Sequence, residues 1–489
     1  MTAFVRSTFP VFNVLGYVVL MFAATMLVPL AFAVAADDGS QRGFDIALLI
    51  TVGSGLALML TTRRFRRELQ VRDGFLLVTL VWTVLPAFAT LPLLMQMPDL
   101  SITDAYFEAM SGLTASGGTA LSGLDQLPLP INIWRHLMVW IGGMGILVLV
   151  VAILPLLGVG GAQAFKAETT GPLKETKLTP RIADTAKALY VIYFVLSFAC
   201  FLAYAWAGMS WSDAFMHMCS TLGLGGFSSH DASFAYWNSP LLEGVAVVFM
   251  TLAGFSFLLH FTVWRRKSLS PYWNSAEARA FMLTLAATVL VVAAFLLVQN
   301  VYSDWQSALR YALFNVVSVA TTTGFSNTDY NLWPVFAPIL MLFVSGFATC
   351  AGSTGGGIKM MRALILLKQA RREMVRILHP RLINPVCIDD KVVENNVIFA
   401  VLAFMLVYGG SIIWLTLLLL LSGLDVTTAF TAIVACVNNT GPGLNQVGPA
   451  SNFGVLSDFQ TWVCTFAMLI GRLELFSVLV LLTPAFWRK

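Results

Sequence analysis

Long apolar runs constrain this chain more than any other feature of its sequence. It contains roughly ten apolar runs of about 20 residues, the length that crosses a bilayer. Only 11% of its residues are charged, whereas a soluble protein carries roughly 25%. We therefore predict an all-α polytopic membrane protein. The first run, residues 11–36, is too long for a signal peptide and is expected to stay as a membrane helix.

Basic residues are concentrated in alternate loops between these runs, and the densest group lies in residues 359–391. The positive-inside rule places such loops in the cytoplasm, which predicts two cytoplasmic termini and an even number of spans. The basic loops can contact anionic lipid headgroups or a soluble partner. No nucleic-acid-binding element is present. The six cysteines have neither paired nor CxxC spacing, which argues against disulfides and metal sites.

Four short stretches on the opposite side share one plan. Each has an apolar, helix-like part, then small or polar residues, and then a glycine, at intervals of roughly 100 residues. They read "DAYFEAMSGLTASGGT" (104–119), "DAFMHMCSTLGLGGFS" (213–228), "ALFNVVSVATTTGFSN" (312–327) and "AFTAIVACVNNTGPGL" (429–444). The first two superpose without a gap, and the fourth is the weakest match. The glycines are taken as Gly117, Gly225, Gly324 and Gly441.

This repetition predicts a duplicated unit of span, short re-entrant helix, small-residue loop and span. One such stretch alone would fit an ordinary outer loop, but four with a common plan would not. Asp104, Asp213, Asp304 and Asp425 suit the N-terminal ends of the short helices. The negative ends would then point at the membrane centre and stabilise a cation. The expected divisions are two N-terminal spans in 1–70 and repeats in 71–165, 166–270, 271–385 and 386–489.

Small residues at this depth have a physical reason. Irregular backbone inside a membrane is tolerated only where it is buried in protein or lines a water-filled cavity. Rings of backbone carbonyls can replace the hydration shell of K⁺, and glycine permits the backbone conformations that such a loop needs. The hydroxyls of the Thr and Ser residues can form hydrogen bonds behind the loop. We therefore interpret "ATTTG" as one quarter of an ion-selectivity filter.

The quartet "TASGG", "LGLGGFS", "ATTTGF" and "NNTGPG" resembles the filter of the Trk/Ktr/HKT superfamily of potassium transporters, and the two extra N-terminal spans are typical of its TrkH-type bacterial uptake subunits. The resemblance covers essentially the whole chain. It implies four pseudo-symmetric helix–pore-helix–helix repeats around one ion pore in the bacterial inner membrane. Gly117 favours K⁺ over Na⁺, and "TASGG" is a small departure from the usual "TTTGA". The implied K⁺ ligands are the backbones of Thr114, Ala115, Ser116, Gly117, Leu222, Gly223, Leu224, Gly225, Thr321, Thr322, Thr323, Gly324, Asn438, Asn439, Thr440 and Gly441.

A second glycine-rich stretch, "GFATCAGSTGGGIKMMR" (346–362), interrupts a long apolar run. Its glycines cannot sustain a regular helix cheaply. A phosphate-binding loop is disfavoured because Ile358 precedes Lys359 and no strand comes before it, whereas tight helix packing remains an alternative. The resemblance implies an intramembrane gate under the filter, with Arg472 beside it. For Arg472 a salt bridge with Glu474 is the alternative. The expected gate residues are Gly346, Gly352, Ser353, Gly355, Gly356, Gly357, Lys359 and Arg472.

These features predict potassium-selective translocation rather than enzymatic activity. The alternative is a proton- or sodium-coupled potassium symporter, which would need a titratable residue near the ion site, and the quartet "TASGG", "LGLGGFS", "ATTTGF" and "NNTGPG" contains none. An intramembrane enzyme would need a catalytic pair. Ser228 near His230 is the one candidate, and it fits the loop after the second filter better. The resemblance further implies K⁺ as the transported ion, no organic cofactor, a homodimer and a cytosolic nucleotide-binding regulatory subunit of the TrkA type.

Overall fold

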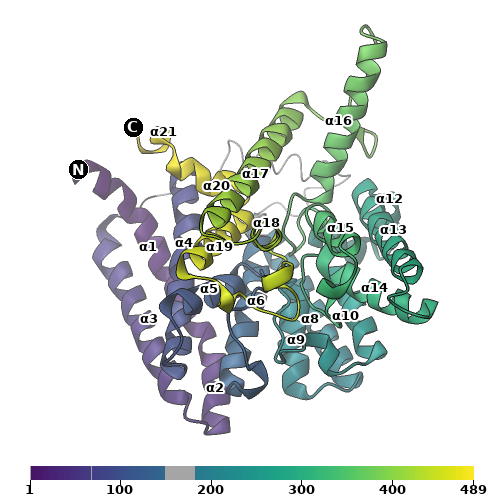
Figure 1. Ribbon diagram of the computed structural model, residues 1–489. Coiled ribbons are helices and arrows are strands. Elements are labelled where there is room, and N and C mark those ends of the chain that lie inside the picture. The colour runs from purple at the N-terminus through teal and green to yellow at the C-terminus, as the bar shows by residue number, and fades with distance from the viewer. Residues whose placement is uncertain (1, 66, 68, 149–181, 489) are drawn as a thin grey trace.

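The computed structural model of the chain describes residues 2–65, 67, 69–148 and 182–488. Almost all regular structure in that part is helical, which confirms the predicted all-helical class (Figure 1). The exception is a small antiparallel hairpin of β1 (Cys387–Ile388) and β2 (Lys391–Val392). Six helices are long and apolar enough to cross a membrane, or up to eight if each of two bent pairs is one span.

Three helices and a 3₁₀ turn come before the repeated units. They are α1 (Thr2–Thr25), α2 (Leu27–Ala36), α3 (Gln41–Thr62) and η1 (Arg63–Phe65). They supply two candidate spans, Thr8–Ala36 and Gln41–Phe65, where the apolar runs predicted two. Helices α1 and α3 pack closely because Gly16 has no side chain. A Cβ there would lie only 2.9 Å from the backbone nitrogen of Met59.

The rest of the chain alternates long helices with short ones, four times over. The first unit contains α4 (Val71–Gln96), α5 (Ile102–Leu113), η2 (Leu124–Gln126) and α6 (Leu129–Val148), and the second contains α8 (Ile182–Trp206), α9 (Trp211–Gly223), η5 (Ser233–Tyr236), α10 (Pro240–Gly254) and α11 (Phe257–Arg266). The third contains α12 (Ser270–Asn274), α13 (Ala276–Val298), α14 (Trp305–Ala320), η6 (Tyr330–Leu332), α15 (Phe336–Ser345) and α16 (Met360–Leu378). After the hairpin, the fourth contains α17 (Asn395–Leu421), α18 (Val426–Asn438), η7 (Asn445–Val447), η8 (Phe453–Val455), α19 (Asp458–Arg472), α20 (Phe476–Leu479), η9 (Val480–Leu482) and α21 (Pro484–Trp487).

The short helices α5, α9, α14 and α18 begin in equivalent ways. Ser101 and Ser210 are the N-caps of the first two, and their hydroxyls accept hydrogen bonds from the backbone N–H of Asp104 and Asp213 at 3.0 and 3.1 Å. Asp304 and Asp425 cap the other two, with the same contact at 2.7 and 2.9 Å. Each short helix therefore starts with a polar cap and an acidic group, which favours its positive end.

Among the described residues, the helix that follows the short one is broken in the second, third and fourth units, whereas the sequence predicted a break only in the third. Helices α10 and α11 meet at 93°, and α19 meets the helical segment 476–482 at 107°. The backbone freed at the first bend is hydrogen-bonded by the glycine-rich stretch. Cys350 N–H donates to Gly254 O and Phe257 N–H donates to Gly352 O, both at 3.0 Å. These bends leave pieces shorter than a full span, which explains why fewer straight spans occur than the apolar runs predicted.

The N-terminal end of α1 and the C-terminal α21 lie at the same end of the molecule, as does the protruding end of α16 (Figure 1). The expected boundary at residues 165 and 166, together with the basic residues Lys166, Lys174, Lys177 and Arg181, lies outside the described residues. The proposed division into repeats therefore stays a prediction there.

Candidate functional site

The four short helices end in the same backbone conformation. The C-cap in α9 and α18, and the residue after the C-cap in α5 and α14, has a left-handed φ of 51–61°: Leu224, Asn439, Ala115 and Thr322. Two residues further on, a glycine again has positive φ: 80° at Gly117, 51° at Gly226, 93° at Gly324 and 96° at Gly441. We call residues 114–117, 223–226, 321–324 and 438–441 the four small-residue segments.

Hydrogen bonds at the helix ends show which residues correspond between the four segments, and they do so without reference to the φ angles. In each, a backbone N–H reaches the carbonyl five residues earlier. The pairs are Ser116 to Ser111 at 2.8 Å, Gly225 to Ser220 at 3.0 Å, Thr323 to Ser318 at 2.8 Å and Thr440 to Ala435 at 2.8 Å. Gly225 is thus the counterpart of Ser116, and Gly226 is the counterpart of Gly117.

The four segments are arranged in a closed ring. A Cβ placed on each positive-φ glycine would collide with the carbonyl oxygen that precedes the glycine of the next segment. The contacts are Gly117 with Gly225 O, Gly226 with Thr323 O, Gly324 with Thr440 O and Gly441 with Ser116 O. First meets second, second meets third, third meets fourth and fourth meets first, so all four surround a common axis.

This geometry differs from the expected site by one residue in the second repeat. Gly225 was expected to be the filter glycine of the second repeat. Instead, Gly226 has the positive φ, and a Cβ on it would meet Thr323 O of the next segment. We call Gly117, Gly226, Gly324 and Gly441 the ring glycines. Leu222 lies inside α9, and Gly223 ends that helix. Two adjacent glycines made the choice ambiguous. The gapless superposition of 104–119 on 213–228 pairs Gly117 with Gly226, and that signal identifies the correct residue.

Side chains of the segments are bonded to their surroundings. Thr114 Oγ1 contacts Ser116 Oγ at 3.0 Å, and Thr321 Oγ1 contacts Thr323 Oγ1 at 2.8 Å. In the fourth segment Asn439 Nδ2 donates to Ser116 Oγ at 2.7 Å. These hydroxyl bonds agree with the expectation from the Thr and Ser content. The exceptions among the described residues are Thr440 Oγ1 and Asn439 Oδ1, which are buried without a hydrogen-bond partner.

Asn438 shows why side chains need not match between repeats. Its amide accepts a hydrogen bond from the hydroxyl of Tyr408 at 2.5 Å and donates to Ser345 Oγ at 3.1 Å. Both partners belong to the surrounding helices α17 and α15, so this large polar side chain is held in the scaffold.

The glycine-rich residues 346–359, which we call the glycine segment, join α15 to α16 and lie against the inner ends of the ring. Thr354 Oγ1 donates to Leu222 O at 2.9 Å, and Gly356 N–H donates to Thr322 Oγ1 at 2.9 Å. A Cβ on Gly355 would lie 3.0 Å from Thr321 O. A Cβ on Gly356 would collide with Asn438 O of the fourth repeat. The glycine segment therefore lies against the second, third and fourth repeats.

Lys359 folds the glycine segment onto itself. Its ammonium donates to Gly355 O and lies 3.4 Å from Ser353 Oγ. In a phosphate-binding loop this ammonium would point to the ligand, so the geometry argues against that interpretation. The remaining expected members, Gly346, Gly352 and Gly357, lie in the same segment, and Ile358 N–H donates to Gly346 O at 2.5 Å.

Arg472 fastens the glycine segment to the first repeat. Its side chain is buried, and its guanidinium donates to Thr354 O at 2.8 Å and to Gly142 O at 3.0 Å. Glu474, the alternative partner considered from the sequence, instead pairs with Arg362 at 2.8 Å. The two terminal nitrogens of Arg472 are thus bonded to backbone carbonyls rather than to a carboxylate, and its Nε is buried without a hydrogen-bond partner among the described residues.

A cavity of about 240 Å³ lies at the opposite end of the ring and is lined by Gly117, Gly226 and Gly324 among others. Arg135 also lines it and pairs with Glu108 at 2.7 Å, with both side chains fully buried. Among the described residues no group of three or more His, Cys, Asp or Glu side chains could hold a metal ion.

The histidines near the site are bonded within the core. His217 contacts Asp213 O at 2.9 Å through Nδ1 and Ser228 Oγ at 3.1 Å through Nε2. His260 contacts Tyr272 OH at 2.5 Å and Leu252 O at 2.8 Å. Both agree with the expectation of satisfied core histidines.

Comparisons with known families, sequences and structures all identify similar proteins of one family. A family model described as "TrkH: Cation transport protein" matches residues 41–489. The chain is 44% identical over 480 residues to a "Trk system potassium uptake protein TrkH" of Halomonas elongata, covering 98% of this chain and 99% of that protein. It is 42% identical to the protein of the same name in Escherichia coli strain K12, over 98% and 99% of the two chains. The crystal structure of the potassium transporter TrkH from Vibrio parahaemolyticus superposes with a TM-score of 0.90 at 40% identity, covering 98% and 99%.

Proposed function

The chain belongs to the TrkH family of cation transport proteins, and from this membership we propose that it carries potassium into the cell across the bacterial inner membrane. It is a transporter and not an enzyme. The four repeats would surround one pore, with the four small-residue segments as its selectivity filter and the glycine segment as its gate.

The closed ring of four small-residue segments is the observation that carries the proposal. Each ring glycine lies so close to the preceding carbonyl of the next segment that carbonyls from all four repeats surround one axis. Oxygens so placed can replace the water around a bare K⁺. The negative ends of α5, α9, α14 and α18 face the same region and would stabilise a cation. The filter carbonyls we propose are those of residues 114–117, 223–226, 321–324 and 438–441.

The glycine segment would close the inner end of this path. Its contacts with Leu222 and Thr322 support a position directly against the filter. Glycines there permit close approach, and the buried charge of Arg472 beside it would repel a cation. Conduction would then require this segment to move.

The orientation in the membrane is inferred from the basic loops, and the partners are inferred from the family. We propose that both termini and the basic end of α16 are cytoplasmic, because most basic loops lie at that end. In line with the naming of its relatives as parts of a Trk system, we propose a homodimer with one pore in each protomer and a cytosolic nucleotide-binding subunit of the TrkA type. Lipid headgroups would contact the basic loops.

Growth of cells that lack their own potassium uptake systems tests the function directly. Expression of this chain together with its regulatory subunit should restore growth on medium low in potassium. The same cells supplied with an empty vector should grow only when potassium is plentiful. Failure of rescue, with the protein present in the membrane, would count against potassium uptake.

Proton coupling is the competing mechanism, and it predicts a different flux. In reconstituted vesicles, we expect potassium flux at fixed membrane potential to change by less than about twofold when a proton gradient is imposed or collapsed with an ionophore. The reason is that the four small-residue segments contain no side chain that titrates near neutral pH. A flux that disappears with the gradient would favour the symporter.

A further inference from the structure

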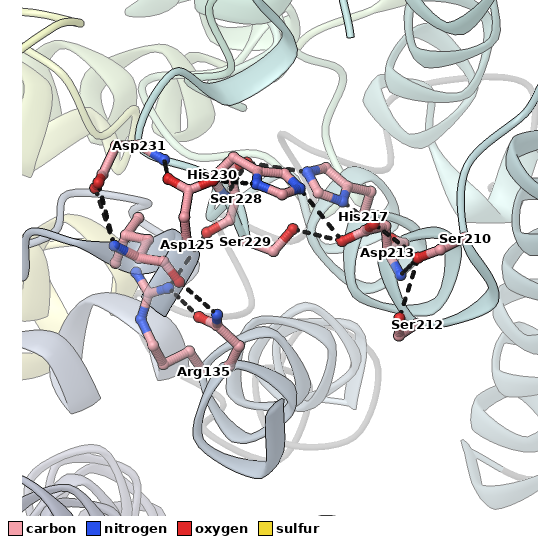
Figure 2. Close-up of polar contacts among 12 residues, drawn as sticks. Asp125, Arg135, Ser210, Ser212, Asp213, His217, Ser228, Ser229, His230 and Asp231 are labelled. Atoms are coloured by element: carbon pink, nitrogen blue, oxygen red, sulfur yellow. Dashed lines mark hydrogen bonds and ion pairs between the residues drawn. The ribbon is translucent and has the colours of Figure 1, made fainter. Parts of the chain in front are cut away.

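A charged cluster connects the first and second repeats beside the cavity at the outer end of the ring (Figure 2). The proposed transport mechanism gives this cluster no role. Its centre is His230, which follows the second small-residue segment closely in the chain. Asp125 comes from η2 of the first repeat, and Asp213 comes from the first turn of α9.

His230 lies between two carboxylates from different repeats. Its Nδ1 contacts Asp125 Oδ1, and its Nε2 lies 3.6 Å from Asp213 Oδ1. The imidazole stacks on Tyr236, with ring centroids 3.5 Å apart and an interplanar angle of 5°, and Trp237 packs edge-on at 4.9 Å. Only 14% of the His230 side chain is exposed, so the ring is held in one orientation.

Backbone hydrogen bonds run in parallel with this side-chain bridge. Leu124 N–H donates to the carboxylate of Asp231 at 3.2 Å, and Asp231 N–H donates to Asp125 Oδ2 at 3.2 Å. The outer loops of the first and second repeats are thus joined at two consecutive residues on each side.

The same loop is fixed to the filter by short contacts. Ser229 Oγ donates to Asp213 Oδ1 at 2.7 Å, and Arg135 donates to Ser228 O at 3.3 Å while it lies 4.6 Å from the Phe227 ring. Phe227 directly follows Gly226. His230, Gly117 and Gly226 line the same cavity. Movement of the His230 bridge would therefore reach the outer ends of the first two segments.

We propose that His230 is a positioning residue for ion selectivity: by bridging Asp125 and Asp213 it holds the outer ends of the first and second small-residue segments in register. This inference rests on the proposed function. It predicts that the selectivity for K⁺ over Na⁺ depends on the pH at the outer face of the membrane.

The bridge depends on the charge of the imidazole. A protonated imidazole forms an ion pair with each of the two carboxylates, whereas a neutral imidazole carries no charge and forms neither. Partial burial opposes the charge, but the nearby carboxylates of Asp213 and Asp125 raise the pKa of His230 above its ordinary value. Because the pKa is raised, the bridge is complete below the ordinary histidine pKa of about 6.5 and is lost as pH rises through the raised value.

Other charged groups face the cluster and do not replace this bridge. Asp231 adds a further carboxylate from the same loop, bonded to Leu124. Arg135 pairs with Glu108, and His217 is bonded to Asp213 O and Ser228. Loss of the proton from His230 would leave the carboxylates of Asp125 and Asp213 without their shared partner.

The test is the ratio of K⁺ to Na⁺ flux through the full-length protein in vesicles, with the pH at the outer face varied from about 6 to about 9. We expect the ratio to fall at least about threefold as pH rises, because the ion pair between His230 of the second repeat and Asp125 of the first is lost. His230→Gln should give a ratio that does not depend on pH and lies near the wild-type value at alkaline pH. His379→Gln, which removes an exposed histidine at the end of α16, should keep the wild-type profile.

The ratio separates positioning from simple charge, because K⁺ and Na⁺ carry the same charge. If both fluxes change in proportion with pH, or if the wild-type ratio is constant, the inference is overturned. Asp125→Asn gives a second readout. It removes the carboxylate of the first repeat from the bridge, so the ratio at acidic pH should fall toward the His230→Gln value, and a wild-type ratio at acidic pH would contradict the bridge. A wild-type protein that carries no K⁺ at any pH would instead refute the proposed function.

Discussion

Replacing Gly324 by alanine is expected to abolish growth rescue on low potassium and to lower the preference for K⁺ over Na⁺ by at least about tenfold. The backbone at Gly324 has a φ of 93°, and the new Cβ would fall on Thr440 O and lie 2.9 Å from Pro442 Cδ. A side chain in such a backbone region costs about 1–3 kcal/mol, and relief of the clash would displace a carbonyl of the fourth segment. Uptake measured with a rubidium tracer, with and without competing Na⁺, gives the affinity and the ratio.

Gly226→Ala should behave like Gly324→Ala, because Gly226 is the ring glycine of the second repeat and its Cβ would fall on Thr323 O. Gly244→Ala is the matched control. It lies in α10, and a Cβ there would have no heavy atom within 4 Å. If Gly226→Ala kept wild-type uptake and ratio, the ring geometry would be wrong for the second repeat.

The repeated plan of the fold could be predicted because each unit carries its own local signal. A polar N-terminus, an apolar stretch and a positive-φ glycine recur in sequence as they do in structure, and Gly117, Gly324 and Gly441 were placed correctly on the left-handed backbone positions. Glycine identifies such positions since other residues are strained there. Where two glycines are adjacent, as in "LGLGGF", composition alone left the register open by one residue.

The helix breaks in the second and fourth units could not be predicted in the same way. At the bend after α19 the left-handed residues are Glu474 and Leu475, with φ of 55° and 44°. Neither residue type is typical of that conformation, so nothing in the local sequence marks the bend. Contacts from distant parts of the chain are present at both bends. Glu474 pairs with Arg362 of the third unit at 2.8 Å, and the glycine segment is bonded to Gly254 and Phe257 at the other bend. Tertiary structure overrides helix propensity at both places.

The outer cluster was missed for a related reason. From the sequence, His230 was considered only beside Ser228, because those two residues are close in the chain. Its carboxylate partner Asp125 lies in another repeat and is brought near only by the packing of the repeats around the ring. A pattern search within one loop cannot find such a pair.

Replacing Arg472 by alanine is expected to raise potassium flux through the chain alone by at least about tenfold. Two hydrogen bonds from its guanidinium, to Thr354 O and Gly142 O, hold the glycine segment against the first repeat. Hydrogen bonds of a charged group are worth about 1.5–3 kcal/mol each, and each 1.4 kcal/mol lost raises the displaced fraction about tenfold. The variant also removes a buried positive charge next to the cation path. Tracer efflux from vesicles without the regulatory subunit measures the flux.

Two further variants separate the effect of the hydrogen bonds from that of the charge. Arg472→Lys keeps a cation that can reach a carbonyl, so it should raise flux less than alanine does, whereas deletion of residues 355–357 should raise it because the segment no longer reaches the filter. Arg371→Ala removes an exposed arginine from α16 and should leave flux at the wild-type rate. The K⁺ to Na⁺ ratio should stay unchanged in Arg472→Ala, since the four small-residue segments are untouched. Wild-type flux in both Arg472→Ala and the deletion would show that the glycine segment does not limit conduction.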